Sequence, residues 1–383
     1  MDLSYSAEDD TLIGRLDAFA RGKLLAGDIA LEGRDKPPRD FCELIANAGW
    51  FRYLVPKAQG GVFDDVCCYP VCLIRERFAM ASSFASAVFG VQGLGSFPIV
   101  RAGSDALRRQ YLPAMAAGER LGAFAVTERE AGSDVLGIQT EAKRRGDHYV
   151  LNGAKAFISN AGLADNYVVI ARTGEGRSPR SLSAFVVDAE TPGFRLERAM
   201  EIIAFDVLGE LAFEDCAVPE ANRLGREGDG FALTMETLNL YRPTVGAHAV
   251  GLAEAAFEAA RVWAVGREQF GRPIGKFQSI GFKLADMASE IAAARLMVYR
   301  AAKARDEEVP EAVLWASMAK LYATEAAQRV IDEAVQIHGG WGLSKELPLE
   351  RYYREVRALR VYEGTSEIQK LIIANQLLGK GAD

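Results

Sequence analysis

The chain has 383 residues, of which 49% are hydrophobic and 25% are charged, and its formal net charge is -7. This composition is typical of a soluble globular protein with two or three domains. The acidic balance argues against a nucleic-acid partner held through its phosphates. Five cysteines, an odd number at low density, favour a reducing compartment over a disulfide scaffold.

The first ten residues are acidic and do not show a basic region followed by an apolar one, so we expect neither a secretory signal nor a transit peptide and predict a cytoplasmic protein. Residues 78–100 carry no charge, but serines, glycines and Pro98 dilute their hydrophobicity. We therefore expect a buried helix running into a loop and no membrane span. Cys68 and Cys72 have helical spacing and only three histidines lie elsewhere, so we expect no metal site.

Residues 1–120 are predicted to be helical. Apolar side chains recur at spacings of three and four through residues 12–20 and 41–48. Further helices are expected from Cys67 to Ala87 and from Asp105 to Met115.

Residues 121–229 are predicted to form a small β domain. Short β-rich runs at residues 121–126, 148–153, 167–171 and 182–187 are separated by turn residues. They do not alternate with helices, so a compact sheet or barrel is favoured over a doubly wound parallel sheet.

Residues 230–383 are predicted to form a four-helix bundle. Helical periodicity runs through residues 230–268, 279–306 and 310–338, and it returns after Gly364. The fold class is therefore α+β and mostly α: a helical N-terminal domain, a middle β-barrel and a C-terminal four-helix bundle.

The strongest candidate for chemistry is Glu363. It lies at the expected break between an extended run and the last helix, and Gly364 beside it frees the backbone. A carboxylate shielded there from water has its pKa raised toward that of a working base. The alternative is that Glu363 and Glu367 only cap a helix and interact with its dipole.

Four other stretches could hold a ligand. The loop at residues 125–137 offers hydroxyl and backbone N–H donors, and residues 157–162 place an aromatic and a hydroxyl where they could flank a planar ring. Two arginines at residues 267–275 suit phosphate, and the glycines of residues 336–342 admit close approach to the backbone. For the loop at residues 125–137 an ordinary turn is favoured over a ligand site, core packing explains Phe157 and Ile158 equally well, and helix caps are the alternative for the other two stretches. No GxGxxG, P-loop or GxSxG motif is present.

Together these stretches resemble the acyl-CoA dehydrogenase family over essentially the whole chain. The resemblance rests on AVTEREAGSDVLG, NGAKAFISNAG, REQFGRPIGKFQ, QIHGGWGLSKELPLERYYREVR and VYEGTSEIQ, in this order. It implies the same three-part fold with non-covalent FAD, usually in a homotetramer. The implied reaction forms a trans-2,3 double bond in an acyl thioester and passes electrons to an electron-transfer flavoprotein.

The resemblance also implies residue roles. Glu363 would take the α-proton while the β-hydride passes to flavin N5. The residues expected to bind FAD are Phe124, Val126, Thr127, Ser133, Phe157, Ser159, Arg267, Gln269, Phe270, Gln336, Gly340 and Thr365. Those expected to contact the substrate are Ser133, Asn239, Arg242, Tyr362 and Gly364.

Some positions depart from the family pattern. Members that place their base on the first bundle helix do so where this chain has Tyr241, which does not ionise near neutral pH. Asn239 replaces an aspartate that contacts pantetheine in many members, and Glu367 replaces a glutamine near the FAD. Glutaryl-type members carry an arginine that recognises a distal carboxylate. The matching position here is Ser86, and this serine argues against a dicarboxylic acyl chain. The open alternatives are an acyl-carrier-protein-linked dehydrogenase, an oxygen-using oxidase and a non-catalytic binding protein.

Overall fold

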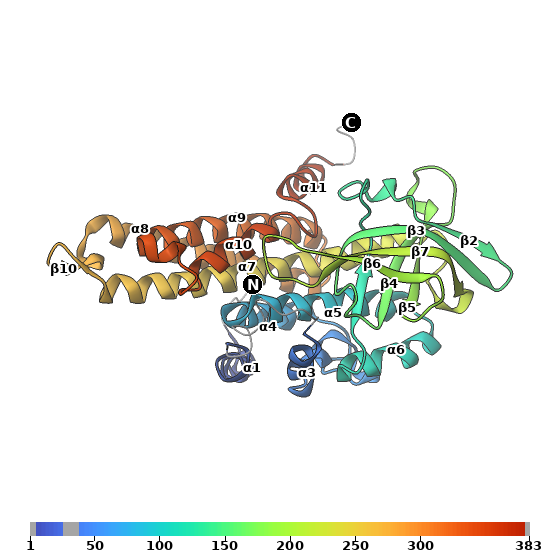
Figure 1. Ribbon diagram of the computed structural model, residues 1–383, viewed down its shortest axis with the longest axis horizontal. Helices are drawn as coiled ribbons and strands as arrows, with labels where there is room; N and C mark the ends of the chain where they lie inside the picture. Colours follow the sequence, from blue (N-terminus) through green and yellow to red (C-terminus); the bar gives the residue numbers. More distant parts are fainter. Residues whose placement is uncertain (1–4, 26–37, 380–383) are drawn as a thin grey trace. The chain divides into compact units, whose positions relative to one another are not determined.

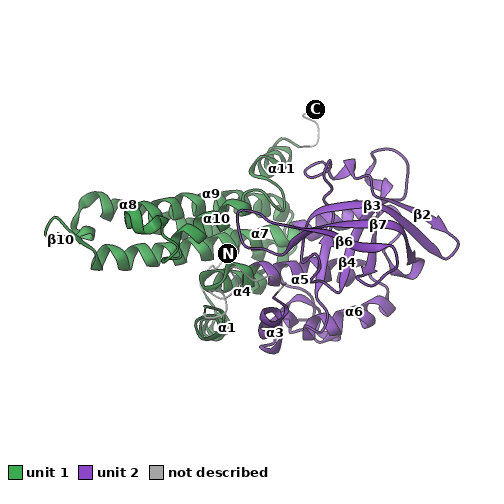
Figure 2. Cartoon of the chain, viewed as in Figure 1, with its two compact units in different colours: residues 1–29, 68–86, 239–383 green, residues 30–67, 87–238 purple. Residues whose placement is uncertain are grey.

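A computed structural model describes residues 5–25 and 38–379 (Figure 1). The chain divides into two compact units (Figure 2). Unit 1 comprises residues 1–29, 68–86 and 239–383, and unit 2 comprises residues 30–67 and 87–238. The predicted α+β, mostly α class is confirmed. The domain boundaries at residues 120 and 229 remain predictions.

Unit 2 contains the sheet, whose strand order is β6-β7-β3-β2-β4-β5-β8, with β1 paired to β4. Most neighbours are antiparallel, and the parallel pairs are β1 with β4 and β2 with β4. The helices α3 (Arg39–Asn47), α6 (Asp105–Ala117) and most of α5 (Ser83–Ala102) belong to the same unit. The strands are β1 (Gly122–Ala125), β2 (Glu141–Arg145), β3 (His148–Ser159), β4 (Asn166–Arg172), β5 (Leu182–Asp188), β6 (Phe194–Met200), β7 (Leu208–Pro219) and β8 (Arg223–Leu224).

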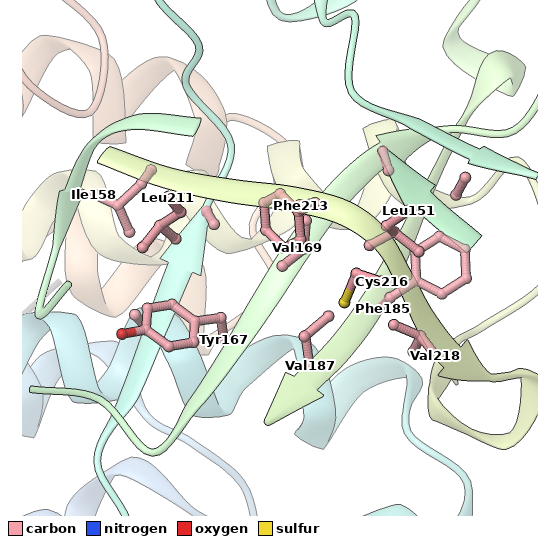
Figure 3. Packing of buried hydrophobic residues seen from close by; sticks show 14 of the residues in the cluster. Leu151, Ile158, Tyr167, Val169, Phe185, Val187, Leu211, Phe213, Cys216 and Val218 are labelled. Atoms are coloured by element: carbon pink, nitrogen blue, oxygen red, sulfur yellow. The ribbon is translucent and has the colours of Figure 1, made fainter. Parts of the chain in front are cut away.

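One hydrophobic cluster fills the inner side of this sheet (Figure 3). Side chains from six strands meet in it, for example Leu151 of β3, Val169 of β4, Phe185 of β5 and Phe213 of β7. The sheet therefore curls around its own core, as expected for a barrel. Alternate residues point away from this core, and those positions are free to meet a ligand.

Strand β2 lies outside the predicted strands, and β3 is longer than the predicted run at residues 148–153. The run Glu141–Arg145 is charged, and only Ala142 of it is buried, so it lacks the apolar signal of a strand. Strand β3 extends to Ser159 because register shifts with β7 accommodate Gly153 and the residues after Lys155. The predicted turn near residue 153 is therefore a bulge within one strand.

Unit 1 is helical. Its helices are α1 (Ala7–Phe19), α4 (Cys68–Ala81), the greater part of α7 (Gly230–Gly266), α8 (Gln278–Asp306), α9 (Ala312–His338), α10 (Leu349–Leu359) and α11 (Ser366–Leu378). The prediction of an extended run before Glu363 is wrong, because helix α10 occupies the preceding residues up to Leu359. Leu349, Tyr352, Val356 and Leu359 recur at helical spacing on the buried face of α10.

Helix α5 is long and apolar enough to cross a membrane by length and composition, yet 83% of its most apolar window is buried inside the protein. That burial is the mark of a core helix. The helix continues to Ala102 with Pro98 inside it, so the loop expected near residue 100 is wrong.

Helices α4 and α7 of unit 1 approach each other closely at Gly251. A Cβ placed there would lie 2.2 Å from the backbone oxygen of Glu76 and 2.8 Å from the Cβ of Ala79. The glycine therefore allows the two backbones to pack in contact.

We predict that Gly251→Ala destabilises the protein by about 2 kcal/mol or more, because backbone atoms must move to relieve the overlap. Gly281 in α8 is the matched control, since a Cβ there meets no atom within 4 Å. Gly281→Ala is expected to stabilise by about 0.5–1 kcal/mol through helix propensity. Denaturant unfolding of both variants checks the pair, and an equal effect of the two alanines would contradict the close approach.

Candidate active site

The turn between α10 and α11 holds Glu363 in an unusual backbone conformation. Its φ is +53°, a left-handed value that is costly for a residue other than glycine. Thr365 caps α11 by accepting a hydrogen bond from the N–H of Ile368 at 3.3 Å. Such backbone strain persists only where the surrounding structure fixes the conformation, and it is common at functional sites.

Three buried side chains of unit 1 hold the backbone of this turn. Gln369 donates to the carbonyl oxygens of Glu363 at 3.3 Å and Gly364 at 3.0 Å. Lys320 of α9 donates to the same Gly364 oxygen at 2.8 Å, and Arg242 of α7 approaches the Glu363 oxygen at 3.5 Å. The turn is therefore fixed by polar contacts from three helices, α7, α9 and α11.

The carboxylate of Glu363 lies in a cationic and desolvated environment. Its Oε2 atom is buried and has no hydrogen-bond partner among the described residues. Burial raises the pKa of Glu363 above the ordinary glutamate range, while the positive charges of Arg75, Lys320 and Arg242 oppose part of this rise. A carboxylate in this state is a stronger base than an exposed one.

The neighbouring cations are perturbed in the opposite sense. Burial lowers the pKa of Lys320 to about 8, although Glu363 favours its charged form. Burial also lowers the pKa of Arg242. Both groups gain from a negative charge at Glu363, so they stabilise its ionised form.

The structure brings the expected substrate residues of unit 1 together around this turn. Asn239 accepts a hydrogen bond from Arg242 at 2.6 Å, and Arg242 contacts the backbone of Glu363. Tyr362 and Gly364 flank Glu363 and are half-buried. Burial raises the pKa of Tyr241 further from neutrality, so Tyr241 does not replace Glu363 as a base.

In unit 2, five of the expected flavin residues lie on or beside the ends of β1 and β3. Phe124 and Val126 alternate with the core residues Ala123 and Ala125, so they point away from the core. The backbone oxygen of Thr127 accepts from the N–H of Ala156 at 2.9 Å, which joins this segment to β3.

A buried ion pair fixes the same junction. Lys155 of β3 donates to the backbone oxygen of Val126 at 3.0 Å and to the Glu128 carboxylate at 2.8 Å. Glu128 also accepts from the N–H groups of Gln139 and Thr140 at 2.7 and 3.0 Å. Both ends of the loop at residues 126–140 are thus tied to one carboxylate.

Phe157 is the clearest sign of a planar ligand in unit 2. Its φ is +56° and the residue is 54% exposed, at the point where the register of β3 with β7 shifts between Lys155 and Ile158. Ser159 on the same outward face is half-buried, and Ser133 is exposed in the loop. An exposed aromatic held by a strained backbone beside hydroxyl donors fits the stacking and hydrogen-bonding needs of a flavin ring.

The other expected FAD residues lie at one end of the helical bundle. Trp263 of α7 stacks on His338 of α9 with 4.9 Å between ring centroids, and Arg267 lies 5.9 Å over the Trp263 ring. This stack brings Arg267 near the Gln336–Gly340 segment. Gln269 and Phe270 belong to the adjacent β9–β10 hairpin, formed by Glu268–Gln269 and Arg272–Pro273, and Phe270 is 93% exposed with a φ of +53°.

Thr365 is not brought to this end of the bundle. It caps α11, which lies at the other end of unit 1 from the β9–β10 hairpin (Figure 1). Within one chain these residues therefore do not form a single site. All of the site assignments remain predictions about function.

Three residues that contribute to these contacts were not predicted from the sequence: Arg75, Lys155 and Lys320. Each is a buried charge with a relative exposure of 2% or less. Lys320 follows the buried Ala316 by four residues in α9, and Arg75 follows the buried Val71 by four residues in α4. A charged residue on the apolar stripe of a helix was the available signal.

Comparison with known proteins agrees with this layout. Family models match in three consecutive segments: acyl-CoA dehydrogenase N-terminal domain at residues 6–119, middle domain at residues 123–216 and C-terminal domain at residues 228–378.

Two curated relatives and one solved structure illustrate the similarity. The acyl-CoA dehydrogenase of Bacillus subtilis (strain 168) is 40% identical, covering 94% of this chain and 95% of its own. The caffeyl-CoA reductase-Etf complex subunit CarC of Acetobacterium woodii is 37% identical and covers 98% of this chain and all of its own. The butyryl-CoA dehydrogenase structure from Megasphaera elsdenii has a TM-score of 0.95 at 35% identity, covering 99% of this chain and all of that one.

The raised pKa of Glu363 predicts a pH-dependent cost to stability. The carboxyl binds its proton more tightly in the folded chain than in the unfolded chain, so its ionisation opposes folding. We expect Glu363→Gln to be more stable than the wild type at pH 8. This advantage should shrink as the pH falls and vanish below the unfolded-state pKa of about 4.3.

Thermal unfolding of both proteins between pH 4 and pH 8 checks this prediction. An advantage of the glutamine variant that does not change across this range would show that the pKa of Glu363 is not raised.

Proposed function

The chain belongs to the acyl-CoA dehydrogenase family, and on this premise we propose that Glu363 is the base that removes the α-proton of an acyl-CoA thioester. Enzymes of this family are FAD-dependent oxidoreductases that act on a CH–CH group of acyl-CoA, and this chain is of that type. The observation that carries the proposal is the buried Oε2 of Glu363, which has a raised pKa and no hydrogen-bond partner among the described residues.

Glu363 and the residues that contact its turn have different roles in the proposed proton transfer. Glu363 accepts the proton at its carboxylate, and desolvation makes this carboxylate basic enough for the task. The left-handed backbone at Glu363 aims the side chain, and Gln369 and Lys320 keep the turn from relaxing. The backbone N–H of Glu363 is proposed to donate to the thioester carbonyl, which stabilises the negative charge that develops on its oxygen.

FAD supplies the acceptor for the β-hydride when it is bound. We propose that Phe124, Val126, Thr127, Phe157 and Ser159 hold the flavin ring, and that Ser133 donates to it or to the thioester. Arg267 and Gln269 are suited to the diphosphate, since a guanidinium offers paired donors to phosphate oxygens. The loop carrying Thr127 and Ser133 is kept in place by the Lys155–Glu128 ion pair.

We further propose that an electron-transfer flavoprotein accepts the electrons from the reduced enzyme. A relative at 37% identity is named as a subunit of a complex with Etf, which supports this partner class. The double bond formed is expected to be trans-2,3 in the acyl group.

Replacing Glu363 with glutamine keeps the shape of the side chain and removes its basicity. We expect Glu363→Gln to slow bleaching of the flavin absorbance by a saturated acyl-CoA by about 10²–10⁴-fold, the usual contribution of a general base. Stopped-flow spectroscopy under anaerobic conditions measures this rate. Glu346→Gln is the control, because Glu346 is exposed and lies outside the site. Bleaching at the wild-type rate in Glu363→Gln would refute the assignment.

We also propose that the protein is a homotetramer. Unit 1 exposes large apolar side chains on α7, α8, the β9–β10 hairpin and the segment after α9, and a soluble monomer rarely leaves such a surface uncovered. They are Val262, Val265, Phe270, Phe282, Leu296, Trp341 and Leu343. A second copy would also complete the cofactor site, because the β9–β10 hairpin that follows Arg267 and the helix α11 that Thr365 caps lie at opposite ends of unit 1 (Figure 1).

Light scattering after size-exclusion chromatography is expected to give about four times the 41.6 kDa of one chain. Phe282→Glu should lower this mass, because it places a charge on the proposed interface. Val62→Glu, at an exposed apolar residue of unit 2, should leave the mass unchanged. A wild-type mass of one chain would contradict the proposal.

A further inference from the structure

Strand β3 contains a bulge at the aromatic residue that is proposed to face the flavin. The register of β3 with β7 shifts between Lys155 and Ile158. Two residues of β3, Ala156 and Phe157, therefore stand opposite one residue of β7, Glu210. A bulge of this kind bends the strand and re-aims its side chains, and Phe157 within it has the left-handed φ of +56°. The way in which Phe157 is presented thus depends on what holds the bulge.

Glu210 lies on the same outward side of the sheet as Phe157. Their chain neighbours Leu211 and Ile158 belong to the hydrophobic core (Figure 3). Successive side chains of a strand point to opposite faces, so Glu210 and Phe157 point away from this core. Glu210 is nevertheless only 5% exposed, because other side chains cover it.

Two arginines bind the carboxylate of Glu210. Arg198, which stands opposite on β6, donates through Nε at 3.0 Å and through Nη2 at 2.8 Å. Arg129 donates through Nη2 at 2.6 Å. The hydrogen bonds from Arg198 and Arg129 hold the pKa of Glu210 at about 2, so this carboxylate is ionised throughout the neutral pH range.

Arg129 reaches Glu210 from a different part of the chain. It belongs to the loop at residues 126–140 and follows Thr127 by two residues. The backbone oxygen of Thr127 accepts from the N–H of Ala156, inside the bulge, at 2.9 Å. The ion pair of Arg129 with Glu210 therefore joins this loop to β7 at the level of the bulge.

We propose that Arg129 and Glu210 are positioning residues for the flavin, because their ion pair locks the bulge of β3 in the form in which Phe157 faces the ring. Neither residue has to touch the cofactor, since both act through the backbone of Ala156 and Phe157. A strained backbone persists only where its surroundings fix it, and this ion pair fixes it from the β7 side. The inference rests on the proposed contact between Phe157 and the flavin.

The chain offers a matched ion pair outside the bulge. Arg195 of β6 and Glu214 of β7 are also joined by a hydrogen bond, at 2.8 Å, four residues along β7 from Glu210. The side chain of Glu214 is 71% exposed, whereas that of Glu210 is 7% exposed. An exposed pair of this kind contributes little, so Arg195 and Glu214 serve as controls.

The affinity for FAD tests the proposal. Dilution of the FAD-loaded protein releases flavin, and the fluorescence of the released flavin gives the Kd. Arg129→Gln and Glu210→Gln are each expected to raise the Kd about tenfold, because each removes a charge-assisted hydrogen bond at the bulge. The double variant should also raise it about tenfold, not about a hundredfold, since the two residues act through one contact. Arg195→Gln and Glu214→Gln should each change it less than about twofold.

Two further measurements separate positioning from a loss of stability. At saturating FAD, the visible circular dichroism of the flavin bands should change in Arg129→Gln and stay as in the wild type in Glu214→Gln. Arg129→Lys should bring the Kd to within about threefold of the wild type, because Arg129 meets Glu210 through a single nitrogen and a lysine keeps its charge. If Glu210→Gln fails to fold, Arg129→Gln carries the test, since the side chain of Arg129 is 67% exposed.

The failures of the two proposals are distinguishable. Equal Kd values in Arg129→Gln and Glu214→Gln, additive effects in the double variant, an unchanged flavin spectrum in Arg129→Gln or no rescue by Arg129→Lys would each refute the positioning role and leave the flavin site in place. An unchanged Kd in Phe157→Ala would refute the proposed flavin contact itself, and the inference with it. A wild type that binds no FAD would overturn both proposals.

Discussion

Desolvation of one carboxylate is the constraint on which this structure depends. An isolated ionised glutamate is not stable in a buried position, so the fold must supply charge and geometry around Glu363. Arg75, Lys320 and Arg242 provide the charge, and they come from three different helices of unit 1. Burial raises the pKa of Glu363 and lowers the pKa of Lys320, so it disfavours the charged form of each. The opposite charge of the other group favours that charged form.

In unit 2, a buried ion pair likewise fixes the loop at residues 126–140. The Lys155–Glu128 pair is buried, and it closes the segment that carries Thr127 and Ser133. Burial lowers the pKa of Lys155 to about 8, while Lys155 and backbone N–H groups keep the pKa of Glu128 below its ordinary range. The exposed and strained Phe157 stands beside this rigid junction. Rigid support and an exposed aromatic together are what a planar cofactor requires.

Much of this could be predicted from the sequence. The helical, β and helical textures follow from hydrophobic periodicity, and Glu363 stands out because a glycine follows it at a helix start. Strand β2 could not be predicted because its side chains are charged, and α10 was missed because its apolar residues are interspersed with arginines and glutamates. The buried cations could not be predicted because their hydrogen-bond partners are distant in sequence; Arg75 and Thr244, for example, are 169 positions apart.

The left-handed backbone of certain non-glycine residues could not be predicted from the sequence either. Six occur in the described chain, and three of them, Phe157, Phe270 and Glu363, had been singled out as candidate site residues. No local pattern distinguishes them from ordinary turns, because the strain is imposed by tertiary contacts such as those of Gln369 and Lys320.

The central claim is that Glu363 holds its proton at a pH where ordinary glutamates are ionised. Infrared difference spectroscopy of protein with isotope-labelled glutamate, wild type minus Glu363→Gln, follows the protonated carboxyl band of this one residue during a pH titration. The account predicts a band that persists above the ordinary glutamate pKa of about 4.3. A band that has already vanished at that pH would contradict it.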